Sequence, residues 1–260
     1  MKRVLFFLFW AGLVCCLSQS SAEELIVLTY NIHHGEGADG QVDLDRIVSV
    51  INKVDPDVVC LQEVDRNLSR TARQDFPALL SEKLDMQVFF ELNYLFDGGE
   101  YGNATLTRLP VSKHHNRTLP NPVNAEPRGC LTVTITWQGM TVDVLNTHLG
   151  LNGQERLAQA EALVAALGEN PVILAGDMNE NLTAPAMQRL TAKLKDTFMK
   201  QAGSPAGTVP ADTPRRRIDY ILVSGEFEAV KSTIVYDETT RVASDHLPYC
   251  VVLRCPDPKG

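Results

Sequence analysis

Five short segments of this sequence combine carboxylate, amide and imidazole side chains, and each lies at the end of a hydrophobic run. In the last of them Asp245 stands beside His246, where a carboxylate and an imidazole can hold a metal ion and handle a proton at one point. The other four carry Asn31 with His33, Glu63 with Asp65, Asp177 with Asn179, and Asp219. Because residues just beyond strand ends commonly carry chemistry, the pattern indicates one site assembled from distant segments.

Two of these segments favour shared chemistry. Asp177 and Asn179 are two residues apart, so in extended backbone they face one side and offer a carboxylate oxygen and an amide to one ligand. A simple turn is the alternative, because Asp and Asn both favour turns. Asp219 lies in an apolar run, where an unpaired carboxylate is costly. We therefore expect a partner for it, and a histidine is the natural one.

The remaining candidate residues also have plain structural explanations. Glu63 could be a solvated carboxylate at a strand end, and His148 could be a histidine satisfied within the core. Tyr101 and Asn103, on either side of a glycine, could be ordinary strand residues around a bulge. Arg128 could form a surface ion pair or reach a phosphate. Taken singly, none of these residues identifies a function.

Hydrophobic patterning predicts the elements that must position these groups. Apolar, β-branched runs predict strands at residues 25–29, 58–61, 87–91, 101–108, 130–137, 140–148, 172–175, 218–223, 229–235 and 249–253. Helical spacing predicts helices at 44–54, capped by Asp43, and at 76–84, 154–167 and 184–194. The segment 201–216, rich in Gly, Pro and Ala, predicts a mobile loop. The result is one α/β domain of packed sheets with helices outside.

The first 22 residues have the pattern of a signal peptide. Lys2 and Arg3 precede an apolar run at 4–17 that is short for a membrane helix, and small residues at 20–22 offer a cleavage point. We therefore expect a secreted or periplasmic protein, with a single catalytic domain at 23–260 and no membrane-spanning segment after cleavage.

Charge and cysteine content restrict the partners. Removing residues 1–22 takes away two cations and no acids, which changes the formal net charge from −8 to −10. Such a chain has no strong basic surface for nucleic acid, although a bound divalent cation can reverse the local field at a site. Cys60 lies in an apolar run and is expected to be a buried free thiol. The spacing of Cys130, Cys250 and Cys255 leaves their pairing open.

Together and in this order, the polar segments resemble the endonuclease/exonuclease/phosphatase superfamily. The resemblance runs from about Leu25 to Leu253, and its most specific parts are Leu61-Gln62-Glu63, Gly176-Asp177-Met178-Asn179, Arg217-Ile218-Asp219-Tyr220 and Ser244-Asp245-His246. It implies a four-layer α/β sandwich, in which two mixed sheets pack face to face with helices outside and the site lies at one end.

The resemblance also implies roles for individual residues. Glu63 resembles the main Mg²⁺ ligand, with Asn31 and Asp245 beside it, and oxygen ligands suit a hard cation such as Mg²⁺ or Mn²⁺. The implied catalytic residues are His246, oriented by Asp219, and His148, Asp177, Asn179 and Tyr101; the implied phosphate contacts are Asn103, Asn179 and Arg128. His33 departs from the pattern, because abasic-site endonucleases carry an acid there.

The implied activity is that of an Mg²⁺-dependent phosphoric-ester hydrolase, first of all a phosphodiesterase that uses in-line attack of water. Nuclease action on DNA or RNA, and phosphomonoesterase action on a phosphoinositide or sugar phosphate, remain open. A catalytically silent binding module on the same fold is a further alternative, which the intact site residues disfavour. We expect a monomer whose substrate is a phosphate ester of nucleic acid, lipid or a small molecule.

Overall fold

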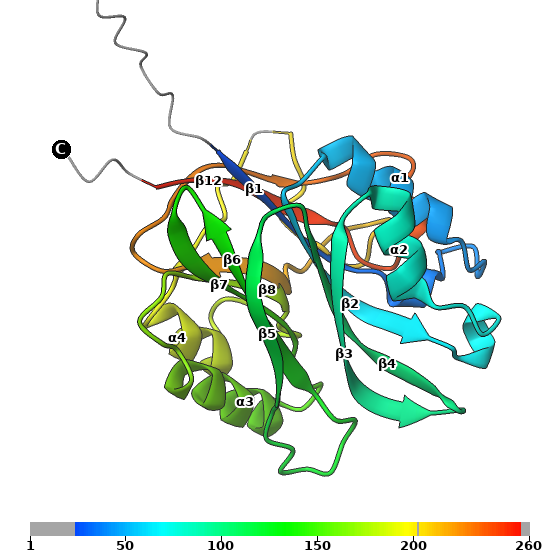
Figure 1. The fold of residues 1–260 in the computed structure, drawn as a ribbon, viewed down its shortest axis with the longest axis horizontal. Helices are drawn as coiled ribbons and strands as arrows, with labels where there is room; N and C mark the ends of the chain where they lie inside the picture. Colours follow the sequence, from blue (N-terminus) through cyan, green and yellow to red (C-terminus); the bar gives the residue numbers. More distant parts are fainter. Residues whose placement is uncertain (1–23, 202, 256–260) are drawn as a thin grey trace, which may run out of the picture.

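The computed structural model describes residues 24–201 and 203–255, so the predicted signal peptide at 1–22 lies outside the described residues. The described chain forms two six-stranded sheets that face each other, with helices on their outer sides (Figure 1). Each sheet contains both parallel and antiparallel neighbours. The predicted fold class, a four-layer α/β sandwich of two mixed sheets, is confirmed.

The first sheet carries the strands that hold Asn31, Glu63 and Tyr101. Its order is β11 (Glu228–Ile234), β12 (Tyr249–Arg254), β1 (Leu25–Asn31), β2 (Val58–Arg66), β4 (Gly99–Thr107) and β3 (Gln87–Phe96). Only β1 and β2 run parallel. Their carboxyl ends therefore meet at the same edge, where Asn31 pairs with Gln62.

The second sheet carries the strands that hold His148, Asp177 and Asp219. Its order is β5 (Val111–Thr118), β6 (Gly129–Trp137), β7 (Met140–His148), β8 (Val172–Asp177), β10 (Asp219–Val223) and β9 (Lys195–Asp196). Here β7 and β8 are the parallel pair, and their register sets His148 opposite Asp177. The antiparallel register of β8 and β10 sets Asp177 opposite Asp219.

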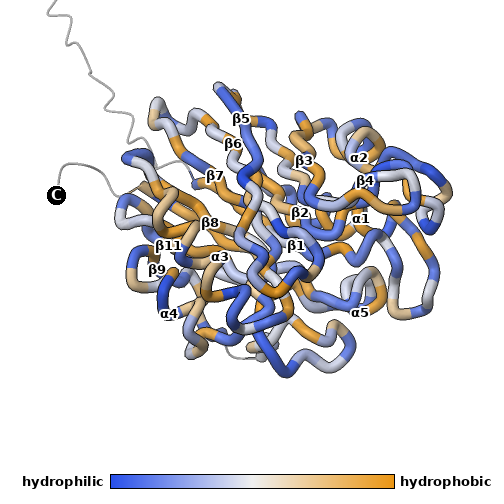
Figure 2. The backbone as a smooth tube through the Cα atoms, turned by 90° about the horizontal axis from the view of Figure 1, so that it is seen from below, coloured by the Kyte–Doolittle hydropathy of each residue, from blue (hydrophilic) through white to orange (hydrophobic). Residues whose placement is uncertain are grey.

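Side-chain alternation divides the interior into three apolar layers. In β1, Leu25 and Val27 belong to the core between the sheets, whereas Leu28 and Tyr30 pack under the helices α1 (Leu44–Val54) and α2 (Phe76–Leu84). The helices α3 (Gly153–Ala165) and α4 (Pro185–Thr191) cover the outer face of the second sheet. Figure 2 shows hydrophobic segments along the central strands and hydrophilic segments mostly in the surrounding loops.

Several predicted boundaries differ from the observed ones. The strand predicted at 58–61 continues to Arg66, because a bulge between Leu61 and Val64 lets the chain keep pairing with β4. Strand β5 was not predicted, because its exposed edge position lets it carry Lys113, His114 and His115 in place of an apolar pattern. The helix predicted at 184–194 ends at Thr191. In contrast, Asp43 caps α1 as predicted, since its carboxylate accepts from two amides of the first turn.

Within the described residues, no helix has both the length and the apolar character needed to cross a bilayer. Cys60 is a buried free thiol, as predicted. Cys130, Cys250 and Cys255 are also free, so the described chain contains no disulfide among these cysteines.

Candidate functional site

The predicted site residues meet around one cavity of about 550 Å³ where β1, β7 and β8 end. Eight of them line its wall: Glu63, Tyr101, Arg128, His148, Asp177, Asn179, Asp245 and His246. Asn31 and Asp219 lie behind the wall and bond to residues that line it. Asn103 differs from these two, because it neither lines the cavity nor donates its side-chain amide to a residue that does.

Glu63 reaches the cavity from within β2 and not from the end of the strand. At the bulge its backbone adopts φ 58°, a left-handed conformation that turns one residue out of the ladder. The Asn31 side-chain amide donates to Glu63 Oε1 at 2.9 Å and to Asp177 Oδ2 at 3.2 Å. Asn31 therefore links the carboxylates of the two sheets, while its own Oδ1 accepts from the backbone of His33 at 3.1 Å.

The segment before β12 is held in place by the loop predicted to be mobile. Thr208 in that loop is fully buried, its backbone carbonyl accepts from Leu247, and its hydroxyl accepts from the backbone amide of Ile218 at 3.2 Å. The amide of Ala211 donates to the backbone oxygen of Asp245 at 2.8 Å. The loop is thus packed against the site and positions Asp245 and the start of β10.

His246 and Asp219 form a buried pair. The carboxylate Oδ2 of Asp219 lies 2.9 Å from His246 Nδ1, so the histidine partner expected for Asp219 is present. The other ring nitrogen, Nε2, lies 3.7 Å from Asp177 Oδ2. Burial opposes protonation of His246, but the charges of Asp219 and Asp177 outweigh it and raise the pKa of the imidazole. His246 can therefore present a proton to the cavity while Asp219 fixes the ring.

His148 has the opposite electrostatic setting. Burial, and then the positive charges of Arg128 and His246, lower its pKa well below the ordinary value. Arg128 Nη1 lies 2.9 Å from His148 Nδ1, and because a guanidinium can only donate, this nitrogen must accept. The proton of the neutral ring then lies on Nε2, which is 3.4 Å from Asp177 Oδ2. The two histidines therefore flank Asp177 in different protonation states.

Asp177 and Asn179 both line the cavity, but not through an extended backbone. Asn179 has φ 52°, and its amide donates to Asp177 Oδ1 at 2.8 Å, which closes a turn of the kind that Asp favours. The predicted geometry was therefore wrong, although the two side chains do share one space. Asn179 Nδ2 lies 3.0 Å from His148 Nε2, but with the proton on Nε2 both atoms are donors, so the amide donates instead to the Leu149 carbonyl at 2.9 Å. Burial raises the pKa of Asp177, which His246 partly offsets.

Arg128 and Tyr101 close another side of the cavity. Arg128 is 7% exposed, so it is a buried cation and not a surface one, and Glu126 pairs with it at 3.0 Å. Its Nε is buried without a partner among the described residues. Burial, reinforced by Glu63, raises the pKa of Tyr101 well above the ordinary value, so its phenol stays neutral.

Asn103 serves the framework instead of the cavity. Its amide donates to the backbone carbonyls of Gly129 at 3.3 Å and Asn146 at 3.4 Å, and so joins the first sheet to the second. Sequence reasoning gave no role to His34 or to Arg70 and Glu126, all of which line the cavity. His34 was visible beside His33 in the polar segment after β1, but the other two carry no local signal.

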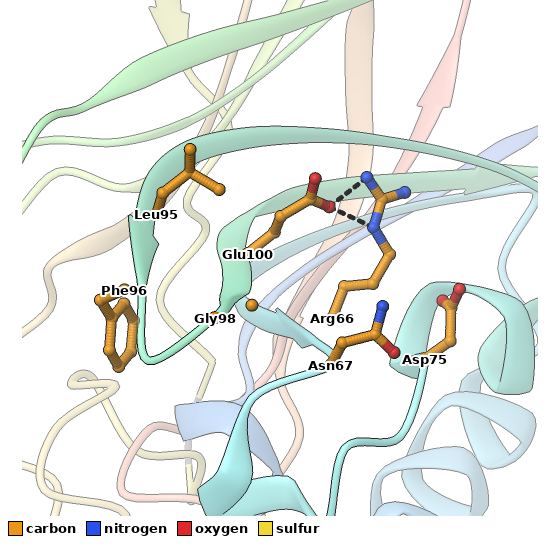
Figure 3. Close-up of a pocket in the computed structure, with 8 residues that line it drawn as sticks. Arg66, Asn67, Asp75, Leu95, Phe96, Gly98 and Glu100 are labelled. Atoms are coloured by element: carbon orange, nitrogen blue, oxygen red, sulfur yellow. Dashed lines mark hydrogen bonds and ion pairs between the residues drawn. The ribbon is translucent and has the colours of Figure 1, made fainter.

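A second hollow, of about 640 Å³, lies beside the hairpin of β3 and β4 (Figure 3). Arg66 and Glu100 form an ion pair across it, so its main charges neutralise each other. Phe96 lines both this hollow and the predicted site. None of the residues predicted to do chemistry lines the hollow.

Comparisons with known proteins agree with this geometry. The model of the Endonuclease/Exonuclease/phosphatase family matches residues 28–246. Uncharacterized protein YbhP of Escherichia coli strain K12 is 32% identical over 240 residues, which cover 85% of this chain and 93% of that protein. The range matched by the family model includes every residue that lines the cavity.

Solved structures share the fold. One described as an endonuclease/exonuclease/phosphatase from Beutenbergia cavernae has a TM-score of 0.78 and 30% identity, over 89% of this chain and 72% of that one. The human Nocturnin catalytic domain has a TM-score of 0.73 and 20% identity, over 90% and 95%. The mannosyl-6-phosphatase of Bacteroides thetaiotaomicron has a TM-score of 0.71 and 21% identity, over 88% and 99%. At such identities, the last two establish similarity of fold alone.

Proposed function

Because the chain belongs to the endonuclease/exonuclease/phosphatase family, whose members hydrolyse phosphoester bonds, we propose that it is a divalent-metal-dependent phosphodiesterase. One observation carries the proposal. Glu63 and Asp245 both line the cavity, and neither carboxylate has an ion-pair partner within the described chain. Two uncompensated carboxylates beside a histidine–carboxylate pair form a site that can bind a cation and that has a proton carrier.

The residues present fit a hard cation. Glu63, Asp245 and the Asn31 side chain would hold Mg²⁺ or Mn²⁺, since carboxylate and amide oxygens are their preferred ligands. When bound, the ion supplies positive charge that offsets the negative charge of the phosphoryl oxygens. Asn31 would also position the two carboxylates, because its amide donates to both Glu63 and Asp177.

The protein side chains supply orientation and proton transfer. Asp177 and Asn179 lie on the wall between the two histidines and would orient the attacking water for in-line displacement. His246, held by Asp219, would contact a phosphoryl oxygen or exchange a proton with the water. His148, Arg128 and Tyr101 face the same space and would contact the phosphate or protonate the leaving oxygen. Each such proton transfer contributes about 10²–10⁴ in rate.

Phosphomonoester hydrolysis is the second candidate, and the two arginine side chains of the cavity wall support it. Arg70 and Arg128 both line the wall, and a monoester dianion carries more charge for them to bind than a diester. Each guanidinium already has a carboxylate partner, Asp65 and Glu126 respectively. Because these carboxylates already neutralise the two guanidinium groups, the cavity has little spare positive charge for a dianion. We therefore place the diester first.

The test is a substrate panel on the purified protein, covering DNA, RNA, sphingomyelin, phosphoinositides, sugar phosphates and p-nitrophenyl mono- and diesters. Excess EDTA should abolish hydrolysis, and Mg²⁺ or Mn²⁺ should restore it. Glu63→Gln should keep the fold and weaken the response to added metal. Full activity in excess EDTA would contradict the metal-dependent mechanism, and hydrolysis of monoesters alone would replace the first candidate by the second.

A further inference from the structure

Two histidines beside Glu63 are not used by the proposed mechanism. His33 and His34 form the short 3₁₀ turn η1 (His33–Gly35) that follows β1, and both line the cavity. One ligand atom from each of His33, His34 and Glu63 lies within 4.8 Å of the others. All three residues have left-handed backbones, with φ of 44°, 44° and 58°. Their convergence therefore depends on two unusual backbone turns, one just after the end of β1 and one at the bulge within β2.

Each imidazole keeps one nitrogen free for a ligand. His33 Nδ1 lies 3.3 Å from the backbone carbonyl of Glu36, which only accepts, so the proton belongs on Nδ1 and the lone pair on Nε2. His34 Nε2 lies 3.4 Å from the Glu36 carboxylate. His34 Nδ1 is buried without a partner within the described chain, and the residue is only 6% exposed. A buried lone pair without a donor is costly unless something else binds it.

The hydrogen bonds to Glu36 support both rings as metal ligands. Neutral imidazole is the form that binds metal ions, and a hydrogen bond from its other nitrogen to a carboxylate or carbonyl is the usual support for such a ligand. Glu36 provides that support to both rings, through its carbonyl to His33 and its carboxylate to His34.

We propose that His33, His34 and Glu63 form a mixed nitrogen and oxygen position for a divalent transition-metal ion such as Mn²⁺, Co²⁺ or Zn²⁺. It lies next to the oxygen-only set of Glu63, Asn31 and Asp245 and shares Glu63 with it. Imidazole suits these ions, whereas Mg²⁺ prefers oxygen ligands alone. The inference rests on the proposed function only through Glu63, and it specifies which cation class the site selects.

The experiment measures metal binding directly and needs no substrate. The protein is purified without a histidine tag, stripped with chelator, and titrated with Co²⁺ by visible absorption and with Mn²⁺ and Mg²⁺ by calorimetry. The wild type should bind Co²⁺ and Mn²⁺ at least tenfold more tightly than Mg²⁺. Loss of one ligand, in His33→Asn or His34→Gln, should weaken Co²⁺ binding by on the order of tenfold or more and leave Mg²⁺ binding within about threefold.

Two further variants serve as controls. His115→Asn removes an exposed histidine of β5 and should leave Co²⁺ binding unchanged. His246→Asn removes the imidazole of the second group of possible ligands, Asp177, Asp219 and His246, and should also preserve Co²⁺ binding. If His246→Asn abolishes the Co²⁺ spectrum while His33→Asn and His34→Gln keep it, the metal lies at that group and the proposal is wrong.

Other outcomes separate this inference from the proposed function. Equal affinity for Mg²⁺ and Co²⁺ that neither histidine variant alters would overturn the inference, and phosphoester hydrolysis in the same preparation would still support the function. Tight Co²⁺ binding that depends on His33, without hydrolysis of any ester, would support the inference and contradict the function. Because His33 is only half-buried, His33→Asn decides the question even if His34→Gln does not fold.

Discussion

Two buried polar clusters lie close together in this protein and are built on different principles. The amide network consists of Thr29, Gln62, Asn103 and Asn146, all buried between the sheets. The charged site consists of Asp177, Asp219, His148 and His246, which are buried to a similar degree. The first contains only neutral groups, and the second contains two carboxylates and two imidazoles whose charges depend on one another.

The amide network uses its hydrogen-bonding capacity within the protein. Gln62 donates to Asn146 Oδ1 at 2.8 Å, and Asn146 donates to the carbonyls of Ala104 at 2.9 Å and Leu61 at 3.1 Å. These bonds cross from β7 to β2 and β4, so they connect the two sheets. A satisfied neutral network fixes one packing arrangement without the desolvation cost of a charge.

In and beside the charged site, some hydrogen-bonding groups lack a close partner within the fold. Asp177 lies 3.4 Å from His148 Nε2 and 3.7 Å from His246 Nε2, distances longer than those of strong hydrogen bonds. Arg128 Nε has no partner in the described chain. We therefore expect substitutions in the amide network to act mainly on stability and substitutions in the charged site to act mainly on the proposed activity.

The largest expected effect concerns the two histidines of the charged site. His246→Ala and His148→Ala should each lower kcat by about 10²–10⁴, because each removes a proton carrier or phosphate contact. If the two act as one unit, the double variant should lose less than the product of the single losses. The measurement is kcat on the ester that the substrate panel identifies.

Asp219→Asn is the matched control for the histidine variants. It keeps the proton carrier of His246 but weakens the 2.9 Å contact that orients the ring, so it should reproduce the loss of His246→Ala only in part. Circular dichroism should show folded protein for every variant. Wild-type kcat in His148→Ala would show that His148 is a packing residue, and the distinction between the two clusters would then hold for His246 alone.

The next largest effect is on stability and concerns the amide network. Asn146→Leu should lower the free energy of unfolding by roughly 1–3 kcal/mol for each buried partner left unsatisfied. The groups that would lose their partner are the carbonyls of Leu61 and Ala104 and the side-chain amide of Gln62. Denaturant unfolding measures this loss. Because the chemistry lies elsewhere, kcat of the folded variant should change by less than about tenfold, below the 10²–10⁴ that a catalytic group supplies.

A double variant, Gln62→Leu with Asn146→Leu, sharpens this prediction. Replacing both partners of a buried hydrogen bond is less costly than replacing one, so the double variant should be less destabilised than the sum of the two single variants. Simple additivity would mean that the two amides act independently. A kcat loss of the size expected for His246→Ala would mean that the amide network belongs to the catalytic apparatus.

The smallest effect concerns the buried thiols, for which burial is the largest influence on the pKa. Burial raises the pKa of Cys60, Cys130 and Cys250 to about 12. A raised pKa keeps the thiol protonated at pH 8, so these three should resist thiol reagents, whereas half-buried Cys255 should react. Counting reactive thiols in residues 23–260 before and after denaturation tests this. Rapid labelling of more than one thiol in the native protein would reveal opening of the sandwich.

Elements with local signals were predictable from the sequence alone. The apolar run of β1, the helical spacing and Asp43 cap of α1, and the hairpin of β6 and β7 each follow from neighbouring residues, and all were predicted close to their observed bounds. Family resemblance added the sandwich architecture and the residues that meet in the cavity. Strand β5 was not predicted, because an exposed edge strand does not require an apolar pattern.

Tertiary structure alone decided how the site residues are used. The contact of Arg128 with His148 joins positions 20 residues apart, the bond of Asn31 to Asp177 joins positions 146 apart, and neither leaves a local trace. The same holds for Asn103, whose amide faces backbone carbonyls of the other sheet and not the cavity. Residue type sets which chemistry is possible, but protonation and partnership depend on charges and burial that only the packed chain creates.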